Sequence, residues 1–141
     1  MIGVVLAAHG RLAEELLRAL EQICGPCDNF RAMTLSVSSA IGDARNVLDG
    51  AIREADQGDG VLVLTDMFGG SPSNIALTFL GERVEVVTGV NLPMLLKAAT
   101  SRGAEVRLGT LADLVASEGR KSIGRASDFL RPAPKARGAP A

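Results

Sequence analysis

A histidine and an aspartate each follow an apolar segment, and the two are far apart in the sequence. His9 comes directly after the apolar run Ile2–Ala8, and Asp66 closely follows the continuous run Val61–Leu64. Such runs are typical of strands covered on both faces in a parallel sheet. Open α/β sheets bind their ligands at the carboxyl ends of such strands. Imidazole and carboxylate groups carry nucleophilic and acid–base chemistry, so we expect a functional site at this edge.

A glycine-rich turn follows Asp66. Gly69 and Gly70 precede Ser71-Pro72, where serine suits a helix N-cap and proline suits the first helical position. We therefore expect a helix to begin here, with Ser71 as its N-cap. The glycines let backbone amides approach a ligand, and a helix start adds unpaired N–H groups and partial positive charge. Gly69, Gly70 and Ser71 are therefore candidates for binding a phosphoryl group, although an ordinary strand-to-helix connection has the same local pattern.

The composition predicts one globular domain. The chain has 141 residues, of which 47% are hydrophobic and 22% charged, and its net charge is −1. No basic face is evident and Trp and Tyr are missing, so nucleic acid, anionic lipid and flavin are not expected partners. The amino terminus has no basic segment before its short apolar run, so we expect a cytoplasmic protein.

Cys24 and Cys27 form a C-x-x-C motif that is similar to a thioredoxin-type redox pair. In that fold the motif opens a helix. Here it closes one, because Gly25 is typical of a helix C-cap and Pro26 of a stop signal. Two thiolates with one distant histidine also make a poor zinc site. We expect reduced thiols, no metal ion and no cofactor.

Apolar periodicity predicts strands that alternate with helices. The expected strands are Ile2–Ala8, Phe30–Val37, Gly60–Thr65 and Val84–Thr88. The expected helices run from Gly10 to about Gly25, from a cap at Ser38 or Ser39 to Ala55, from Ser71 to Gly81, from about Pro93 to Gly103, and onward from about Thr110. The stripe of the second helix comprises Ile41, Ala44, Val47, Leu48, Ala51, Ile52 and Ala55. This alternation predicts a parallel, doubly wound sheet with right-handed crossovers.

The carboxyl-terminal part of the chain shows a weaker pattern. Residues 121–128 have little helical stripe, and periodicity does not assign them. Residues 131–141, RPAPKARGAPA, are rich in Pro and Ala and have no apolar periodicity. We therefore expect a domain over residues 1–130 and a disordered tail over residues 131–141.

Three segments, in this order and at these spacings, resemble a known family. They are His9-Gly10, the block Thr65–Asn74 and the block Thr88–Leu95. Together they resemble the mannose-type enzyme IIA (EIIA) domain of the bacterial phosphoenolpyruvate-dependent sugar phosphotransferase system, over roughly residues 1 to 125. The resemblance implies a flavodoxin-like sheet with strand order 2-1-3-4. In that order the first and third strands are neighbours, so that His9 and Asp66 meet at the switch point.

The resemblance also implies a function. The histidine that matches His9 accepts a phosphoryl group from the phosphocarrier HPr and passes it to an enzyme IIB (EIIB), and Asp66 matches the acid that hydrogen-bonds this histidine. The family is homodimeric and exchanges a C-terminal strand between subunits, which implies that residues near Ser122–Ser127 pair antiparallel to the edge of the other subunit's sheet. Contact with the membrane would be indirect, through permease components. Ala8 departs from relatives that carry a hydroxyl there, which implies one polar contact fewer to the phosphoryl group.

The chemistry that the resemblance implies needs few groups. A neutral imidazole is a competent nucleophile at pH 7. An aspartate on one ring nitrogen of His9 would fix the tautomer and stabilise the charge that develops on attack. Amides around Gly69–Ser71 would balance charge on the phosphoryl oxygens without a metal ion.

Three other classes of protein share parts of this pattern. A histidine phosphatase needs an arginine before its histidine and a second histidine, whereas position 8 is Ala8 and the chain has one histidine. A receiver-type phospho-aspartate module needs acidic Mg²⁺ ligands after the first strand, and Ala7-Ala8-His9 supplies none. A non-catalytic regulator, in which phosphorylated His9 only switches protein partners, uses the same site and stays open as the alternative.

Overall fold

The computed structural model describes residues 1–35, 41–67, 69–103 and 105–132. Within them one parallel sheet has the strand order β2-β1-β3-β4. The strands are β1 (Gly3–His9), β2 (Phe30–Leu35), β3 (Val61–Thr65) and β4 (Val84–Thr88). The predicted order and direction are therefore confirmed. The predicted strand end at Val37 and the predicted caps at Ser38 and Ser39 lie outside the described residues.

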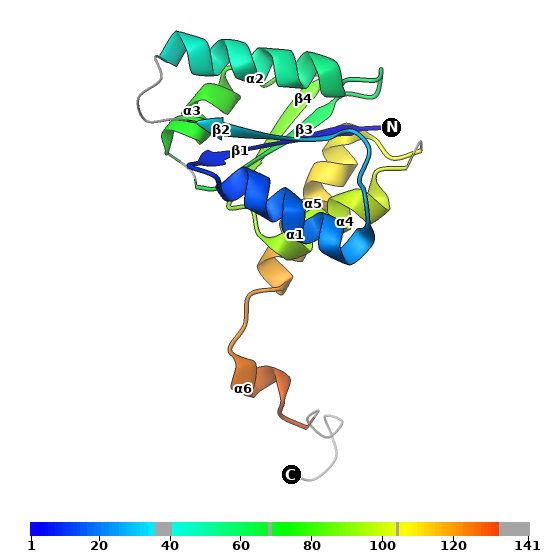
Figure 1. Cartoon of the computed structure of the whole chain (residues 1–141). Coiled ribbons are helices and arrows are strands. Elements are labelled where there is room, and N and C mark those ends of the chain that lie inside the picture. Colours follow the sequence, from blue (N-terminus) through cyan, green and yellow to red (C-terminus); the bar gives the residue numbers. More distant parts are fainter. Residues whose placement is uncertain (36–40, 68, 104, 133–141) are drawn as a thin grey trace.

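Helices cover both faces of the sheet (Figure 1). α2 (Ile41–Ala55) and α3 (Ser71–Leu77) lie on one face. α1 (Leu12–Cys24), α4 (Leu92–Ser101) and α5 (Leu108–Lys121) lie on the other face, and the short α6 (Ala126–Phe129) stands away from the sheet. This is the doubly wound architecture that the alternation of strands and helices predicts.

The two central strands, β1 and β3, supply both hydrophobic cores. Their side chains alternate between the two faces, as the pleat of a strand requires. The core beneath α1, α4 and α5 contains Val4, Leu6, Leu62 and Leu64. The core beneath α2 and α3 contains Val5, Ala7, Val61 and Val63. All eight side chains are fully buried, and each large aliphatic one contributes about 1.5–3 kcal/mol, so the ends of β1 and β3 are firm supports for the residues that follow them.

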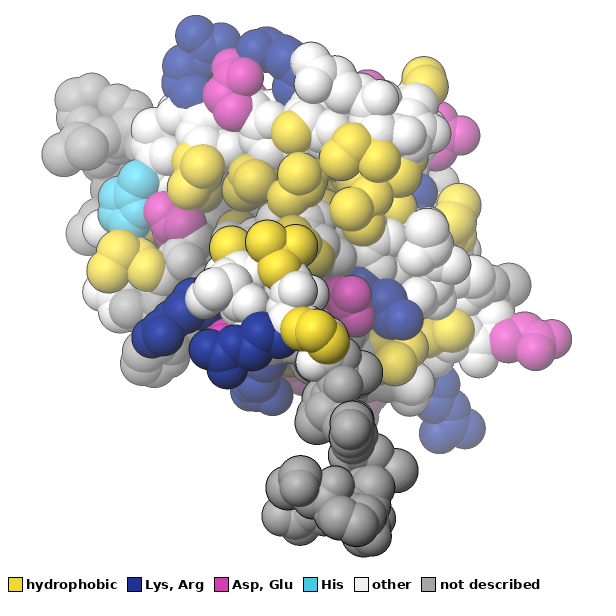
Figure 2. Space-filling view, turned by 90° about the horizontal axis from the view of Figure 1, so that it is seen from below, with side chains coloured by type: hydrophobic (Ala, Val, Ile, Leu, Met, Phe, Trp, Pro, Cys, Tyr) yellow, Lys and Arg dark blue, Asp and Glu magenta, His cyan; other side chains and the backbone are white. Residues whose placement is uncertain are grey.

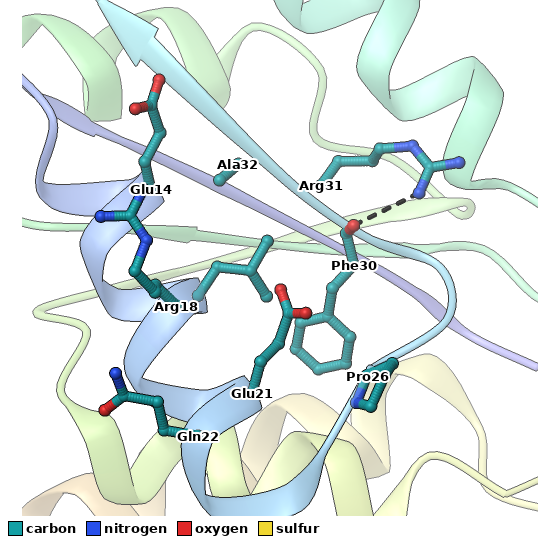
Figure 3. A pocket seen from close by; sticks show the side chains of 9 residues that line it. Glu14, Arg18, Glu21, Gln22, Pro26, Phe30, Arg31 and Ala32 are labelled. Atoms are coloured by element: carbon teal, nitrogen blue, oxygen red, sulfur yellow. Dashed lines mark hydrogen bonds between the residues drawn. The ribbon is translucent and has the colours of Figure 1, made fainter.

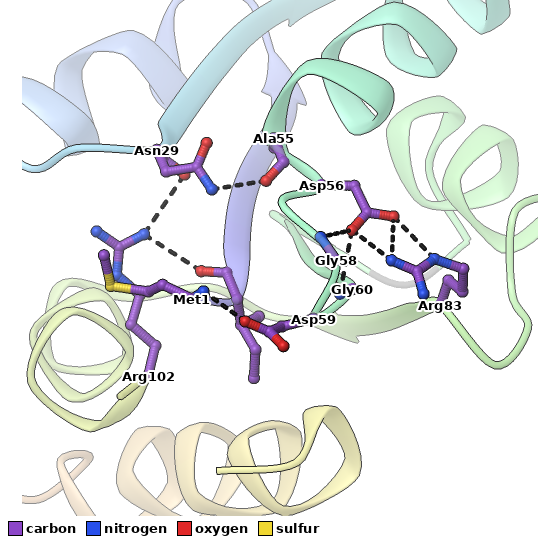
Figure 4. Close-up of polar contacts among 10 residues, drawn as sticks. Met1, Asn29, Ala55, Asp56, Gly58, Asp59, Gly60, Arg83 and Arg102 are labelled. Atoms are coloured by element: carbon purple, nitrogen blue, oxygen red, sulfur yellow. Dashed lines mark hydrogen bonds and ion pairs between the residues drawn. The ribbon is translucent and has the colours of Figure 1, made fainter. Parts of the chain in front are cut away.

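A buried arginine ties the strands together at their amino ends (Figure 4). Arg102 is 5% exposed. Its guanidinium donates to the carbonyl oxygens of Ile2 and Asn29 at 3.3 and 3.5 Å, and also to that of Asp28. It also lies over the Phe30 ring, 4.5 Å from the centroid, as a cation–π pair. These contacts stabilise the scaffold at the end of the sheet opposite to His9.

Two details of the predicted helices are wrong. The apolar periodicity places Val47 on the stripe of α2, but its side chain is 56% exposed while Leu48 is fully buried, because Val47 lies at the edge of the stripe rather than at its centre. α3 ends at Leu77 and does not continue to Gly81. The Thr78 hydroxyl donates to the Ile75 carbonyl at 2.7 Å, and the following N–H groups bond three residues back, which tightens the last turn and ends the helix.

α5 begins at Leu108 and continues through Gly119 to Lys121. Gly119 allows α5 to pack closely on α4, since a Cβ at this position would lie 2.6 Å from Met94 Sδ. In the single chain, residues 122–125 form no strand and α6 follows. This segment projects from the domain (Figure 1) and leaves Ile123, Phe129 and Leu130 exposed. Strand exchange through residues 122–127 stays a prediction, and residues 133–141 of the predicted tail lie outside the described residues.

Candidate functional site

His9 and Asp66 lie side by side at the carboxyl ends of β1 and β3. His9 Nδ1 is 2.6 Å from Asp66 Oδ2, and the backbone N–H of His9 donates to the same oxygen at 3.0 Å. The sheet explains this proximity, because Ala7 of β1 pairs with Thr65 of β3 and the chain continues from both at the same edge. The structure therefore brings together the two residues that the sequence singled out.

The hydrogen bonds of Asp66 decide which nitrogen of His9 is available. Burial alone raises the pKa of the Asp66 carboxyl, but donation from the His9 backbone, the His9 ring and the Met67 N–H outweighs it, so this pKa lies below its usual value. At neutral pH the carboxylate is ionised and can only accept hydrogen bonds. Nδ1 of a neutral His9 ring must then carry the proton. The lone pair is left on Nε2.

The His9 side chain is accessible while its partner carboxylate is sheltered. The exposed fraction of the side chain is 46% for His9 and 13% for Asp66. Figure 2 shows the histidine at the surface, at the edge of a face on which hydrophobic side chains gather. Because Nδ1 faces the carboxylate, Nε2 is the nitrogen that another molecule can approach. An exposed nucleophilic nitrogen with a fixed tautomer can accept a group from a partner and pass it on.

The turn after Asp66 differs from the prediction in one respect. Gly70, not Ser71, is the N-cap of α3, with φ −79° and ψ 167°, and no side chain caps this helix. The chain reaches helical geometry one residue earlier than expected, so Ser71 is the first helical residue and is exposed. Gly69 has φ 86°, a left-handed conformation that favours glycine. Gly70 lies directly against the His9 ring.

Two buried hydroxyls near this turn were not singled out by the sequence. Thr65 and Ser73 are fully buried, and neither hydroxyl has a hydrogen-bond partner among the described residues. Both belong to the block that carries the family resemblance. Hydroxyl residues are common in turns and helix starts, however, so residue type alone gave no reason to select them.

The C-x-x-C motif closes α1 as predicted. Cys24 is the last residue of the helix, and Gly25, with φ 78°, donates its N–H to the Glu21 carbonyl at 2.8 Å. Both thiols are free. Burial, and then the neighbouring Cys24, raise the pKa of Cys27, which disfavours the reactive thiolate. Within the described ranges, no group of three or more His, Cys, Asp or Glu side chains is placed to hold a metal ion.

A cavity of about 690 Å³ lies between α1 and the edge strand β2 (Figure 3). Acidic, basic and apolar side chains line this cavity. The lining residues include Glu14, Arg18, Glu21, Phe30 and Arg31. His9 and Asp66 do not line it, so this cavity is separate from the histidine site. None of the helices in the described ranges combines the length and the apolar character that a membrane span needs.

The fold and the site define a class of protein: a doubly wound α/β domain with a histidine–aspartate pair at the switch point of its sheet. The family model EIIA-man, described as "PTS system fructose IIA component", matches residues 3–116. The chain belongs to this family, the EIIA components of the sugar phosphotransferase system.

Relatives of known name are similar to most or all of the chain. It is 30% identical over 142 residues to the "PTS system mannose-specific EIIAB component" of Escherichia coli (strain K12). The match covers 99% of this chain and 43% of that protein. The chain thus spans less than half the length of that relative. It is 32% identical over 104 residues to the "PTS system fructose-specific EIIA component" of Bacillus subtilis (strain 168), which covers 72% of this chain and 71% of that protein.

Solved structures share the fold over nearly their whole length. Phosphotransferase system component EIIA from Streptococcus agalactiae superposes with a TM-score of 0.81 at 27% identity, covering 91% of this chain and 99% of that one. The mannose/sorbose-specific IIA subunit from Enterococcus faecalis has a TM-score of 0.79 at 28% identity, and the superposition covers 88% of this chain and 93% of that one. The predicted flavodoxin-like class is confirmed.

Proposed function

We propose that this domain accepts a phosphoryl group on Nε2 of His9 and passes it on within a sugar phosphotransferase system. The donor is an HPr-like phosphocarrier and the acceptor an EIIB-type component. One observation carries the proposal: the 2.6 Å contact between His9 Nδ1 and Asp66 Oδ2, which leaves Nε2 as the free nitrogen of a half-exposed ring.

The proposed transfer is a displacement at phosphorus. Nε2 of His9 supplies its electron pair to form a P–N bond, while the bond from phosphorus to the donor breaks and its electron pair stays with the donor. His9 keeps its proton on Nδ1, so the phosphorylated ring is a cation beside the Asp66 carboxylate. When the acceptor attacks, the P–N bond breaks and the ring returns to its neutral form.

The phosphoryl oxygens need positive partners during the transfer. We assign this role to backbone amides in the turn Gly69–Ser71, at the start of α3. Gly70 lies against the His9 ring, which supports amides of this turn as neighbours of a group on Nε2. Phosphoryl transfer depends mainly on position and on charge complementarity, so the proposal includes no metal ion.

The names of relatives support the type of partner but leave the sugar open. The Escherichia coli relative is called an EIIAB component, which supports an EIIB-type acceptor for this domain. The relatives are named for mannose and for fructose, so no particular sugar follows. A purely regulatory role would use the same phosphorylated histidine, and discharge onto an EIIB component distinguishes the two.

We also propose a homodimer that the C-terminal segment holds together. β4 is an edge strand of the described sheet, and a groove of about 340 Å³ runs beside it. The lining of this groove includes Val86, Thr88, Met94, Ala116 and Ile123. The segment after α5 exposes Ile123, Phe129 and Leu130 to 77%, 66% and 84%, which is costly unless another surface covers them. The segment of a second copy, placed along β4, would cover both surfaces.

The test of the relay is labelling of the protein by a phosphorylated phosphocarrier. We expect one phosphate that is labile in acid and stable in base, and no label on His9→Ala. Asp59→Asn is the control, because Asp59 pairs with the amino terminus at the other end of the sheet and the variant should still be labelled. Label that survives acid, or that persists in His9→Ala, would place the phosphate on another residue and end the proposal.

A further inference from the structure

The backbone at Gly70 fills the space beside the His9 ring. A Cβ added to Gly70 would lie 2.8 Å from His9 Cε1 and 3.5 Å from Nε2. Real Cβ atoms essentially never lie within 3.0 Å of a neighbouring heavy atom. A side chain at position 70 therefore requires a shift, and the half-exposed imidazole, at the end of its side chain, is freer to move than the backbone of the turn.

The conformation of Gly70 gives no other reason for a glycine. Its φ of −79° and ψ of 167° are extended values that any residue adopts. Gly69, the neighbouring residue, is the opposite case: its φ is 86°, and a Cβ there would meet nothing within 4 Å. Gly69 therefore permits the backbone conformation of the turn, and Gly70 leaves space for the His9 ring.

The added Cβ would press on Cε1, the ring atom that is bonded to both nitrogens of His9. Cε1 lies between Nδ1 and Nε2, and Nδ1 is fixed 2.6 Å from Asp66 Oδ2. A push on Cε1 turns or tilts the ring, which lengthens the contact to Asp66 and redirects Nε2. The ring thus sits between a carboxylate that holds Nδ1 and a glycine that leaves just enough space.

We propose that Gly70 is a positioning residue for His9: its missing side chain leaves the space in which the imidazole can keep Nδ1 on Asp66 and present Nε2 outward. Its effect on phosphoryl transfer rests on the proposed function, whereas its effect on the ring does not. This role differs from binding phosphoryl oxygens through the amide, because Gly70→Ala keeps the amide and changes only the space.

The first measurement needs no variant and no partner protein. In the wild-type protein we expect a strong nuclear Overhauser effect between the Gly70 α-protons and the His9 ring proton on Cε1. With ¹⁵N-labelled histidine, at a pH where the ring is neutral, we expect the Nδ1–H tautomer. Lack of the proton contact would overturn the proposal, whether or not His9 is phosphorylated.

The second measurement compares Gly70→Ala with Gly50→Ala, a control that adds one methyl group inside α2, where a Cβ would meet nothing within 4 Å. We expect Gly70→Ala to change the ¹⁵N tautomer signals of His9 and to slow phosphorylation at saturating phosphocarrier by tenfold or more. Gly50→Ala should keep the wild-type ring signals. Wild-type ring signals and an unchanged rate in folded Gly70→Ala would overturn the proposal. A ring that changes as expected in a protein whose wild-type form takes no label would contradict the relay but leave Gly70 as the positioning residue.

Crowding of Met67 is the competing cause, since the added Cβ would also lie 3.2 Å from Met67 Cγ. The double variant Gly70→Ala/Met67→Ala separates the two contacts. We expect it to keep the altered ring signals of Gly70→Ala, because the contact with Cε1 remains. Recovery of the wild-type signals would assign the effect to Met67 and overturn the proposal.

Discussion

A single oxygen of Asp66 accepts both hydrogen bonds that His9 offers to it, from the backbone N–H at 3.0 Å and from ring Nδ1 at 2.6 Å. The other oxygen accepts from the Met67 N–H at 2.9 Å. Two backbone donors, one from β1 and one from the turn after β3, therefore orient the carboxylate. Because backbone groups set the direction of the carboxylate, the ring that it holds is also oriented by the sheet.

The charge of Asp66 can be removed without changing its shape. In Asp66→Asn we expect phosphorylation of His9 to slow by up to ~10⁴-fold, by analogy with the loss of the aspartate from a catalytic triad. The fold should survive, because an amide oxygen can still accept from the backbone. Rapid-quench measurement of phosphoryl transfer gives the rate.

The matched control for this variant is Asp59→Asn. Asp59 pairs with the amino terminus at the opposite end of the sheet, so its charge should not affect the rate. A rate for Asp66→Asn equal to that of the control would remove Asp66 from the mechanism.

The meeting of His9 with Asp66 could be predicted from the sequence, although 57 positions separate them. Buried strands read as continuous apolar runs, and parallel strands bring their carboxyl ends to one edge. The order of the strands came from the family resemblance rather than from periodicity. Pattern and resemblance together therefore located the pair.

The role of Gly70 could not be predicted in the same way. The sequence gives Gly69 and Gly70 the same turn preference, and only the φ and ψ values of the turn decide which of them faces the ring. The early end of α3 has a similar cause, since the bond from Thr78 to Ile75 competes with continued helix. Such local competitions depend on atomic positions that residue types do not specify.

The stability of the protein should depend on pH through Asp56 (Figure 4). Its carboxylate accepts hydrogen bonds from Arg83 at 2.6–2.9 Å and from the N–H groups of Gly58 and Gly60 at 2.9 and 3.2 Å. Donation from Arg83, foremost, outweighs burial and lowers the pKa of Asp56. The contribution of Asp56 to the free energy of unfolding is therefore complete above the unfolded-state pKa of about 3.9. This contribution is lost as the pH falls through the lower pKa of the folded state.

Urea unfolding of Asp56→Asn at pH 7 and pH 3 tests this dependence. We expect the variant to be less stable than the wild type at pH 7 and to lose less stability on acidification. Arg83→Gln should also be less stable than the wild type at pH 7. The double variant should lose less free energy of unfolding than the two single variants lose together. Equal losses on acidification in wild type and Asp56→Asn would contradict the assignment.

Replacement of two glycines, Gly3 and Gly50, by alanine should change the stability of the protein in opposite directions. In Gly3→Ala the new Cβ would overlap the backbone carbonyl of Ala55 and lie 2.7 Å from its Cβ, so we expect a loss of about 1–3 kcal/mol from overpacking. Gly50 lies inside α2 and a Cβ there would meet nothing within 4 Å, so Gly50→Ala should gain up to about 1 kcal/mol. Unfolding in urea measures both free energies, and a Gly3→Ala protein as stable as Gly50→Ala would refute the packing argument.

The segment after α5 should determine whether the protein is a dimer. A chain that ends at Gly119 loses the exposed Ile123, Phe129 and Leu130, so β4 would keep an uncovered edge, and we expect a monomeric or aggregating protein of reduced stability. A chain that ends at Arg131 keeps these side chains and should behave as the full chain does. Sedimentation velocity together with thermal unfolding compares the two. A stable dimer of the shorter chain that is still labelled at His9 would show that residues 120–141 are dispensable, and that subunits are not joined through this segment.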